Sequence, residues 1–294
     1  MRRWTDLILG CALVLAAGCG ENPGEPTARI AVATSYLGTA VRDVLDENVP
    51  LVRLCGPGTC PGHFDMTPGH LARIRRCRLL LRFDFQKHFD AKLRAAVEEG
   101  LEIVGVPESG GLCEPATYRA ACGIAADALV RKGFLSRPAA EARLQKIDAR
   151  LARLAEAVRI RVRDAGLADR HVVAAHHQAR FCRWLGLHVA AEFTGSDDPA
   201  ALNQAVVSAR DAEPRLIVGN TPQGRVIPDR LAEALDVPVV MFENFPSADD
   251  GRRGYDGMVQ RNVDRLCAAA ARRPRSGQTP TPRAPKRRRA KEGP

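Results

Sequence analysis

Residues 136–166 read SRPAAEARLQKIDARLARLAEAVRIRVRDAG and contain no glycine or proline between Pro138 and Gly166. Apolar side chains recur along this stretch in steps of three or four residues, at Leu144, Ile147, Leu151, Leu154, Val158 and Val162. That spacing places them on one face of an α-helix, for which Ser136 supplies a cap and Pro138 a first turn. We expect the connecting helix within 137–167, and its roughly 28 residues without a breaker would span about 40 Å at about 1.5 Å per residue. We expect it to join two halves of the chain as a rigid spine.

Short apolar runs alternate with helical patterns on both sides of this stretch. Before it, the runs lie at 29–34, 51–54, 78–83 and 101–106; after it, they lie at 171–175, 188–193, 216–219 and 237–242. Strands that alternate with helices are typical of parallel sheets covered on both faces. The sequence therefore predicts an α/β fold of two lobes, 29–136 and 168–273. Each lobe has a mainly parallel sheet flanked by helices, and one long rigid helix joins the two.

The first residues carry the features of a bacterial export signal. Two arginines precede an apolar run at 7–17, which is too short to span a bilayer as a helix. The run ends in Leu15-Ala-Ala-Gly-Cys19, which resembles the lipobox, in which the cysteine is acylated. We expect a lipoprotein signal peptide over 1–18, a flexible tether over 19–28 and a membrane anchor at Cys19. An ordinary secretory signal with an incidental cysteine is the alternative.

The formal charge of +10 is concentrated at the ends of the chain. After residue 271 there are nine basic residues and one acid, a net of +8, and the first eighteen residues add +1. The body from 19 to 271 therefore carries about +1, which argues against a specific nucleic-acid binder. We interpret 274–294 as a basic disordered tail, either merely solvated or in contact with an anionic envelope surface.

An extracytoplasmic location permits disulfides. Cys55 and Cys60 flank a short Gly/Pro-rich loop, and Cys113 and Cys122 form a second candidate pair. Seven cysteines remain once the signal peptide and Cys19 are set aside, so at least one thiol stays free or binds a ligand. No pair is spaced as CxxC, which argues against both a thioredoxin-type site and a zinc ribbon.

Residues of metal-ligand type follow three of the predicted strands. His63 lies in the Gly/Pro-rich loop after 51–54, His176 and His177 follow 171–175, and Glu243 follows 237–242. Ligands of open α/β proteins bind beyond the carboxyl ends of the strands. Imidazoles plus a carboxylate, contributed by both lobes, suit a borderline divalent ion such as Zn²⁺.

These features together resemble the zinc- and manganese-binding lipoproteins of ABC transporters. The resemblance rests on the lipobox, on the long central helix, on Pro61-Gly-His-Phe64 leading into Pro68, and on the histidine pair followed by a helix to Trp184-Leu-Gly-Leu187. It implies two α/β lobes joined by one rigid helix, with the metal in the cleft between them. It also implies metal ligation by His63, by His176 or His177, and by Glu243 or Asn244.

Two positions depart from the pattern of that family. Its second histidine, which opens the helix before the spine, is replaced by Leu112-Cys-Glu-Pro115. Cys113 as a thiolate or Glu114 as a carboxylate would take that place, unless Cys113 is only disulfide-bonded. The acidic residue that precedes Pro-Gln in the family is the uncharged Asn220. A site of imidazoles with Glu243 and Glu114 is harder than an all-histidine site, so the resemblance implies zinc first, with manganese and iron as alternatives.

We therefore predict a monomeric substrate-binding protein, lipid-anchored on the periplasmic side of a membrane in the cell envelope. It would capture a divalent transition metal and deliver it to an ABC permease without catalysis. A receptor for a metal chelate or a corrinoid is the alternative within the binding class. An enzyme with Cys182 or Cys113 as nucleophile and His176 as base is the alternative from another class. The chain has no Gly-x-Ser-x-Gly, Gly-x-Gly-x-x-Gly or His-Glu-x-x-His motif to support such an enzyme.

Overall fold

The helix predicted between the two halves is α5 (Arg137–Asp164) in the computed structural model, which describes residues 29–46, 49–56, 64–108, 111–195, 198–247 and 254–271. The Ser136 hydroxyl accepts a hydrogen bond from the Ala139 N–H and caps the helix. Its buried face is the predicted apolar one, with Leu144 half-buried at the beginning. The predicted signal peptide and tether, Cys19, Cys60, His63 and the basic tail lie outside the described residues.

The N-terminal lobe is built on a four-stranded parallel sheet in the order β2-β1-β3-β4. The strands are β1 (Ile30–Val32), β2 (Leu51–Arg53), β3 (Leu79–Phe83) and β4 (Glu102–Val106). The helices that connect them are α1 (Ser35–Leu45), α2 (Pro68–Ile74), the 3-10 helix η2 (Asp84–Leu93) and α3 (Arg94–Glu98). Because the strands are parallel, all four carboxyl ends lie at one edge of the sheet.

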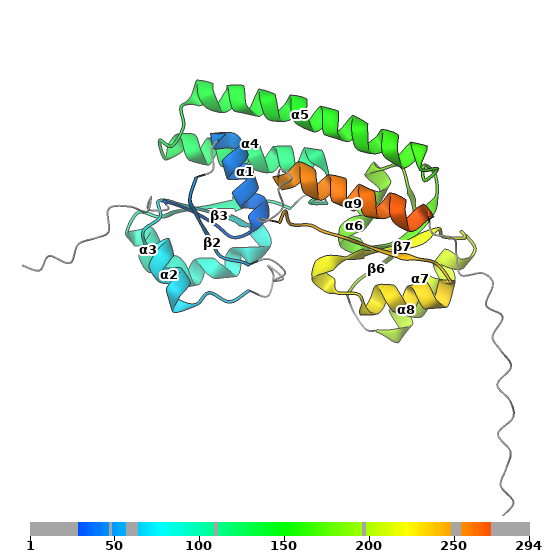
Figure 1. Ribbon diagram of the computed structural model, residues 1–294. Helices are drawn as coiled ribbons and strands as arrows, with labels where there is room; N and C mark the ends of the chain where they lie inside the picture. Colours follow the sequence, from blue (N-terminus) through cyan, green and yellow to red (C-terminus); the bar gives the residue numbers. More distant parts are fainter. Residues whose placement is uncertain are drawn as a thin grey trace, which may run out of the picture.

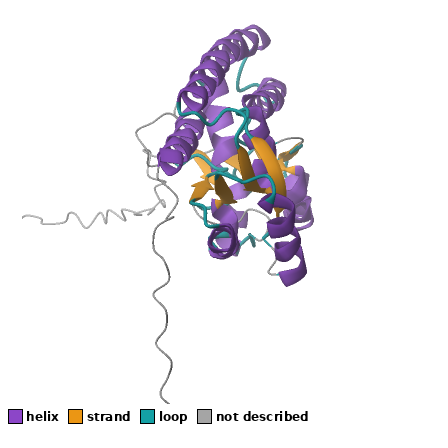
Figure 2. Ribbon diagram, turned by 90° about the vertical axis from the view of Figure 1, so that its right-hand side faces the viewer, coloured by secondary structure: helices purple, strands orange, loops and turns teal. Residues whose placement is uncertain are grey.

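The C-terminal lobe repeats this arrangement with the order β6-β5-β7-β8. The strands are β5 (His171–Ala175), β6 (His188–Phe193), β7 (Leu216–Asn220) and β8 (Val239–Phe242). The helices are α6 (His176–Trp184), α7 (Pro199–Arg210), the short 3-10 helix η3 (Thr221–Gln223) and α8 (Val226–Leu235). The two lobes lie side by side beneath α5, and Figure 2 shows helices on both sides of the strands (Figures 1 and 2). The predicted α/β fold of two parallel sheets with a long helix between the lobes is thus confirmed.

Two further helices complete the layer that covers both lobes. The first, α4 (Pro115–Arg131), packs against α1 and α5. The second, α9 (Gly254–Ala271), follows β8 and packs against α5, β8 and also α1 of the N-terminal lobe (Figure 1). The lobes are therefore connected by α9 as well as by α5, a connection that the sequence analysis does not predict.

One hydrophobic cluster is shared by the two lobes. It includes Val32 and Leu81 from the first sheet, Val172 and Val218 from the second, and the buried face of α5. Each lobe has in addition a smaller apolar cluster of its own on the opposite face of its sheet. A continuous close-packed core resists shear, so movement of one lobe relative to the other is restricted.

The residue that fixes α9 in the N-terminal lobe is Tyr255. Its ring stacks on Tyr118 with centroids 3.9 Å apart and meets Tyr36 edge-on at 6.0 Å. All three rings are buried, and aromatic pairs of this kind contribute about 0.5–1.5 kcal/mol each beyond the area they bury. The first turn of the last helix is thus part of the core of the first lobe.

The helix after β5 includes the histidine pair that was expected to precede it. Because α6 begins at His176, both histidines lie in its first turn. Within the described parts of the chain, no helix has the length and apolar character needed to cross a membrane.

Candidate metal centre

The two histidines lie where the chain turns from β5 into α6. Ala175 is the N-cap of α6, and His176 and His177 follow it, both exposed. Nδ1 of His176 lies 2.8 Å from Oε2 of Glu192, an ion-pairing distance when the imidazole is protonated. Glu192 is near the end of β6, and the parallel register pairs it with Ala174 on β5. The adjacent strand ends therefore place a carboxylate beside the first histidine.

The second carboxylate near the histidines comes from the other lobe. Glu108 follows β4, and it lines a cavity of about 360 Å³ together with Gly111, His176, His177 and Glu192. Burial raises the pKa of Glu108, and the nearby His176 partly opposes this shift. Partial burial of the His177 ring, with a contribution from His176, lowers the pKa of that imidazole and favours its neutral form, which is the form that ligates a metal.

Neither Glu108 nor Glu192 is identified from the sequence. Glu108 lies two residues after a strand, so the rule that led to the histidines and to Glu243 also applies to it. Glu192 is inside a strand, and only its register against β5 reveals its position. The cavity therefore brings together two of the predicted site residues, His176 and His177, with two that the sequence analysis missed.

Glu114 is buried and does not face this cavity as a free ligand. It is the N-cap residue of α4, and its Oε1 lies 2.7 Å from Nε of Arg180 on α6. This ion pair joins the two lobes. The hypothesis that Glu114 replaces the missing family histidine is therefore disfavoured, because a positive charge already neutralises its carboxylate.

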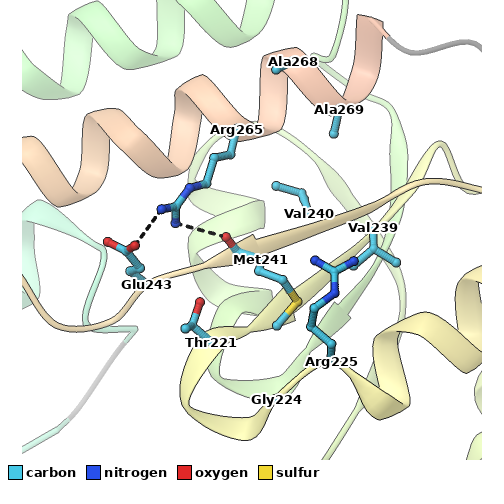
Figure 3. Close-up of a pocket in the computed structure, with 10 residues that line it drawn as sticks. All are labelled: Thr221, Gly224, Arg225, Val239, Val240, Met241, Glu243, Arg265, Ala268 and Ala269. Carbon is cyan, nitrogen blue, oxygen red and sulfur yellow. Dashed lines mark hydrogen bonds and ion pairs between the residues drawn. The ribbon is translucent and has the colours of Figure 1, made fainter. Parts of the chain in front are cut away.

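Glu243 lies in a different cavity from the histidines, so its role as a metal ligand stays a prediction. Its carboxylate accepts a hydrogen bond from Arg265 at 2.7 Å (Figure 3). It accepts another from Arg261 at 3.1 Å, and both arginines lie on α9. Burial alone would raise the pKa of Glu243, but the two arginines outweigh it and lower the pKa. The cavity that Glu243 lines has a volume of about 480 Å³ and contains neither histidine.

Gln178, which directly follows His177 on α6, belongs to a buried cluster of uncharged polar side chains. We call this cluster the amide network: Cys113, Gln178, Asn220, Asn244 and Asn262. The amide nitrogens of Gln178 and Asn244 donate to Oδ1 of Asn220 at 3.1 and 2.9 Å. Sγ of Cys113 lies 3.7 Å from Oδ1 of Asn244, and Nδ2 of Asn262 lies 3.5 Å from the same sulfur. The network joins Cys113 of the N-terminal lobe to four residues of the C-terminal half.

Three residues of the amide network occupy positions at which the family resemblance implies ligands or acidic residues. These are Cys113, Asn220 and Asn244, so the structure does bring those positions together. None of them is charged, and burial raises the pKa of the Cys113 thiol far enough to keep it protonated at neutral pH. The network satisfies its own polar groups and offers no anionic ligand to a metal ion.

The predicted pairing of Cys113 with Cys122 is wrong, since both are free thiols. Cys113 precedes α4, whereas Cys122 lies seven residues beyond its first residue, Pro115. Seven residues of helix span about 10 Å, which exceeds the roughly 7 Å limit between the Cα atoms of a disulfide. Cys55 is buried, and its expected partner Cys60 lies outside the described residues, so that pairing stays a prediction.

The alternative of a cysteine nucleophile is disfavoured by burial. Cys182 is fully buried in α6, and that burial raises the pKa of its thiol to about 12. A nucleophilic cysteine needs the thiolate and access to substrate. Neither Cys182 nor Cys113 has them in this fold.

No three histidine, cysteine, aspartate or glutamate side chains among the residues that the structure describes are arranged to hold a metal ion. The cavity nevertheless collects two imidazoles and two carboxylates within one opening. These are ligand types that zinc, manganese and iron accept. Arg180 and Arg183 line it as well, and Arg183 pairs with Oε1 of Glu192 at 2.6 Å, so metal binding by Glu192 has to compete with this ion pair. Ligation there requires rotamer changes or a further residue.

The chain has two parallel sheets with the same strand order, a long helix across both, and ligand-type residues that the two lobes contribute to one cavity. These features define a two-lobed substrate-binding protein. The profile of the family described as "Zinc-uptake complex component A periplasmic" matches residues 30–269, and the chain belongs to this family. It is accordingly a periplasmic receptor for a divalent metal ion that works with an ABC permease. Its family is one of transport receptors and not of enzymes, and it gives no support to a corrinoid or chelate receptor. No curated protein matches this sequence.

Solved structures of metal-binding proteins share the fold. A zinc-bound ZnuA with residues 138–173 deleted is 16% identical, with a TM-score of 0.67, and the match covers 85% of this chain and 100% of that one. A manganese-bound periplasmic metal-binding protein from Candidatus Liberibacter asiaticus is 11% identical, with a TM-score of 0.68 and coverage of 82% and 98%. The cadmium-bound form of the latter protein gives a TM-score of 0.69 at the same identity and coverage.

Proposed function

We propose that this receptor captures its metal ion at the cavity between Glu108 of the N-terminal lobe and His176, His177 and Glu192 of the C-terminal lobe. The observation that carries the proposal is the convergence of these four side chains on one opening at the carboxyl ends of β4, β5 and β6. The lowered pKa of His177 agrees with this role, because it favours the neutral imidazole, which is the form that ligates a metal. His63 remains a proposed further ligand.

The ligand set favours zinc, with manganese and iron as alternatives. Two imidazoles match the preference of Zn²⁺, whereas the carboxylates also suit the harder Mn²⁺ and Fe²⁺. The amide network would not contact the ion as an anionic ligand. It would hold the two lobes in register, so that loading depends on local side-chain movement more than on wide closure of the lobes.

Calorimetric titration of the purified chain with Zn²⁺, Mn²⁺ and Fe²⁺ tests this proposal. We expect saturable binding by the unmodified chain and at least a hundredfold loss of affinity in the double variant His176→Ala/His177→Ala. The matched control is His171→Ala/His188→Ala, which removes two exposed histidines from the opposite ends of β5 and β6. Equal affinity in the two double variants would place the site elsewhere.

The role of His63 is tested in the same assay. If His63 completes the site, His63→Ala weakens binding by about tenfold or more, in the range expected for the loss of one ligand or its support. Unchanged affinity in His63→Ala, with loss in His176→Ala/His177→Ala, would restrict the site to the four cavity residues.

We also propose that the receptor is a monomer anchored to the membrane through Cys19. Acyl chains on Cys19 would provide stable attachment, which a single chain alone provides only weakly. Fractionation of cells that produce the Cys19→Ala variant should move the protein from the membrane to the soluble fraction, and sedimentation in detergent should give the mass of one chain. Retention of the variant in the membrane would contradict the anchor.

A further inference from the structure

A second cavity, of about 760 Å³, lies in the N-terminal lobe beside the edge strand β2. Three arginines line it: Arg42 from α1, Arg53 at the end of β2 and Arg73 from α2. We call these residues the arginine triad. None of the four described residues of the proposed metal centre, Glu108, His176, His177 and Glu192, lines this cavity.

The local sequence explains why the arginines face the cavity. Ser35, Gly38 and Arg42 are spaced by three and four residues, so they form one stripe along α1. Gly38 lets α1 approach the sheet closely, because a Cβ there would lie 3.4 Å from Val32 and 3.5 Å from Leu51. Arg53 pairs in register with Val32, and its side chain is on the same face of the sheet as Leu51, which also lines the cavity.

The arginine triad has no acidic partner among the described residues. No ion pair joins Arg42, Arg53 or Arg73 to a carboxylate in that part of the chain. Nε of Arg42 is buried there without a hydrogen-bond partner. Burial and the charge of Arg53 both lower the pKa of Arg42, so the fold holds two guanidinium groups close to each other at an electrostatic cost.

Other partly buried arginines of this chain are paired. Arg82 meets Asp90 at 2.6 Å, Arg150 contacts Asp43 and Asp256, and Arg261 meets Glu243 at 3.1 Å. Native structures seldom leave a buried donor unsatisfied. Nε of Arg150 is also buried without a hydrogen bond, but its guanidinium group pairs with two carboxylates, whereas that of Arg42 pairs with none in the described chain. The arginine triad departs from this pattern, and its geometry suits an anionic partner that is not part of the described chain.

We propose that the cavity lined by the arginine triad is a binding site for a multivalent oxyanion, namely a compound with phosphoryl groups or several carboxylates. The guanidinium fork matches phosphate and carboxylate oxygens in a bidentate manner. The volume is within the range of small-molecule sites. A free anion and the phosphate headgroup of a lipid next to the anchored protein would present the same chemistry.

The test is calorimetric titration of the full metal-free chain in detergent with pyrophosphate and with citrate. We expect saturable binding that weakens at least tenfold in Arg42→Gln/Arg53→Gln and in the exposed single variant Arg73→Gln. The matched control is Arg75→Gln/Arg76→Gln, which removes two exposed charges just beyond α2 and should change affinity less than twofold. Binding to the basic tail would be equal in all of these proteins.

Thermal unfolding supplies a readout that a merely structural arginine would not give. Without an anion, Arg42→Gln/Arg53→Gln should raise Tm, because it removes the repulsion between the two charges. With pyrophosphate, the Tm of the unmodified chain should rise, and that of the variant should not. A lower Tm in the variant with unchanged anion affinity would assign Arg42 a structural role and overturn the proposal.

Vesicles separate the two sources of the anion. Phosphatidylglycerol vesicles are compared with phosphatidylcholine vesicles as the blank. If the phosphatidylglycerol vesicles bind the unmodified chain more strongly than they bind Arg42→Gln/Arg53→Gln, the anion is a lipid headgroup. Preferential binding of pyrophosphate or citrate would assign a soluble anion. Absence of saturable binding to all three probes, or equal loss in Arg75→Gln/Arg76→Gln, would overturn the proposal.

Discussion

The cavity with the histidines and the amide network are adjacent, yet they differ in charge and burial. Around the cavity, His176 and His177 are exposed and lie near the carboxylates of Glu108 and Glu192. In the network, by contrast, Cys113, Asn220 and Asn244 are buried and uncharged. The groups that can ligate a metal are thus at the opening, and the groups that satisfy one another are buried.

This difference separates two functions that one set of residues could have combined. Buried uncharged groups contribute to stability when every donor has an acceptor. Exposed imidazoles and carboxylates contribute little to stability, but they are available to a ligand. Changes in the network should therefore alter unfolding, whereas changes around the cavity should alter metal affinity.

The largest effect is expected from Asn262→Leu in the amide network. Asn262 accepts from the N–H of Glu243 and donates to the carbonyl of Glu243, both at 2.9 Å. Leucine would leave the Glu243 N–H without this acceptor, and the carbonyl would keep only the Cys113 thiol at 3.1 Å, at up to about 3 kcal/mol in total. Tm should fall by roughly 6–12 °C in a calorimetric scan. The exposed Asn203→Leu serves as control, and a loss no greater than in this control would refute a stabilising network.

The next effect concerns the ion pair between the lobes. Arg180→Met leaves the buried Glu114 carboxylate without its partner at 2.7 Å. Because the Arg180 side chain is 60% exposed, we expect a modest loss of about 1–2 kcal/mol in chemical unfolding. Adding Glu114→Gln should recover most of this loss, since the carboxylate is then absent. Additive losses in the double variant would show that the two residues do not interact.

Glu192→Gln should weaken metal binding without altering stability. The amide keeps the shape of the carboxylate, but the negative charge beside Nδ1 of His176 is lost. Affinity should fall about tenfold, as is common when a carboxylate that supports a ligating histidine is changed. Asp169→Asn is the matched control, because Asp169 pairs with His188 at the opposite strand ends. A similar fall in both variants would indicate only a loss of overall charge.

The smallest effect is a change in pH dependence. Metal affinity should fall as pH is lowered, because protons compete for the imidazoles and then for the carboxylates. Glu108 has a raised pKa through burial, so it becomes neutral at a higher pH than an ordinary glutamate. Glu108→Gln should therefore weaken binding at pH 7 and flatten the affinity profile at mildly acidic pH. A profile that is unchanged in slope would remove Glu108 from the site.

The same substitution has a predicted sign in stability. A raised pKa means that the folded chain disfavours the charged carboxylate, so stability falls as pH rises through that pKa. Glu108→Gln should raise Tm slightly at pH 7, by the equivalent of less than about 1 kcal/mol. The difference should vanish below the ordinary glutamate pKa of about 4.3.

The sequence is sufficient to predict the long helix and the two sheets, because the patterns that indicate them are local. The apolar steps from Leu144 to Val162 predict α5, and the alternation of strands with helices predicts both sheets. The bridge formed by α9 was not predictable in this way. It depends on the long-range insertion of Tyr255 beside Tyr118, and neither residue carries a local signal for that contact.

The site was only partly predictable from the sequence. The rule that ligands bind at the carboxyl ends of strands points to His176 and His177, which do line a cavity. The same rule also points to Glu243, which lines a different one. The arginines that neutralise Glu243 lie 18 and 22 residues further along the chain, on α9. Glu192 was missed for the opposite reason, since its position depends on pairing between strands. Partners across helices and strands are tertiary information, and local patterns do not contain them.

The position of Tyr255 has a consequence for the order in which the protein folds. The aromatic group in the N-terminal lobe is completed by a residue that is synthesised after both sheets, and the shared core remains open until then. Lobes that fold independently can mature one after the other as the chain emerges. Here, the first lobe should become fully protected from hydrogen exchange only when the second is finished, and the chain should unfold in a single cooperative transition.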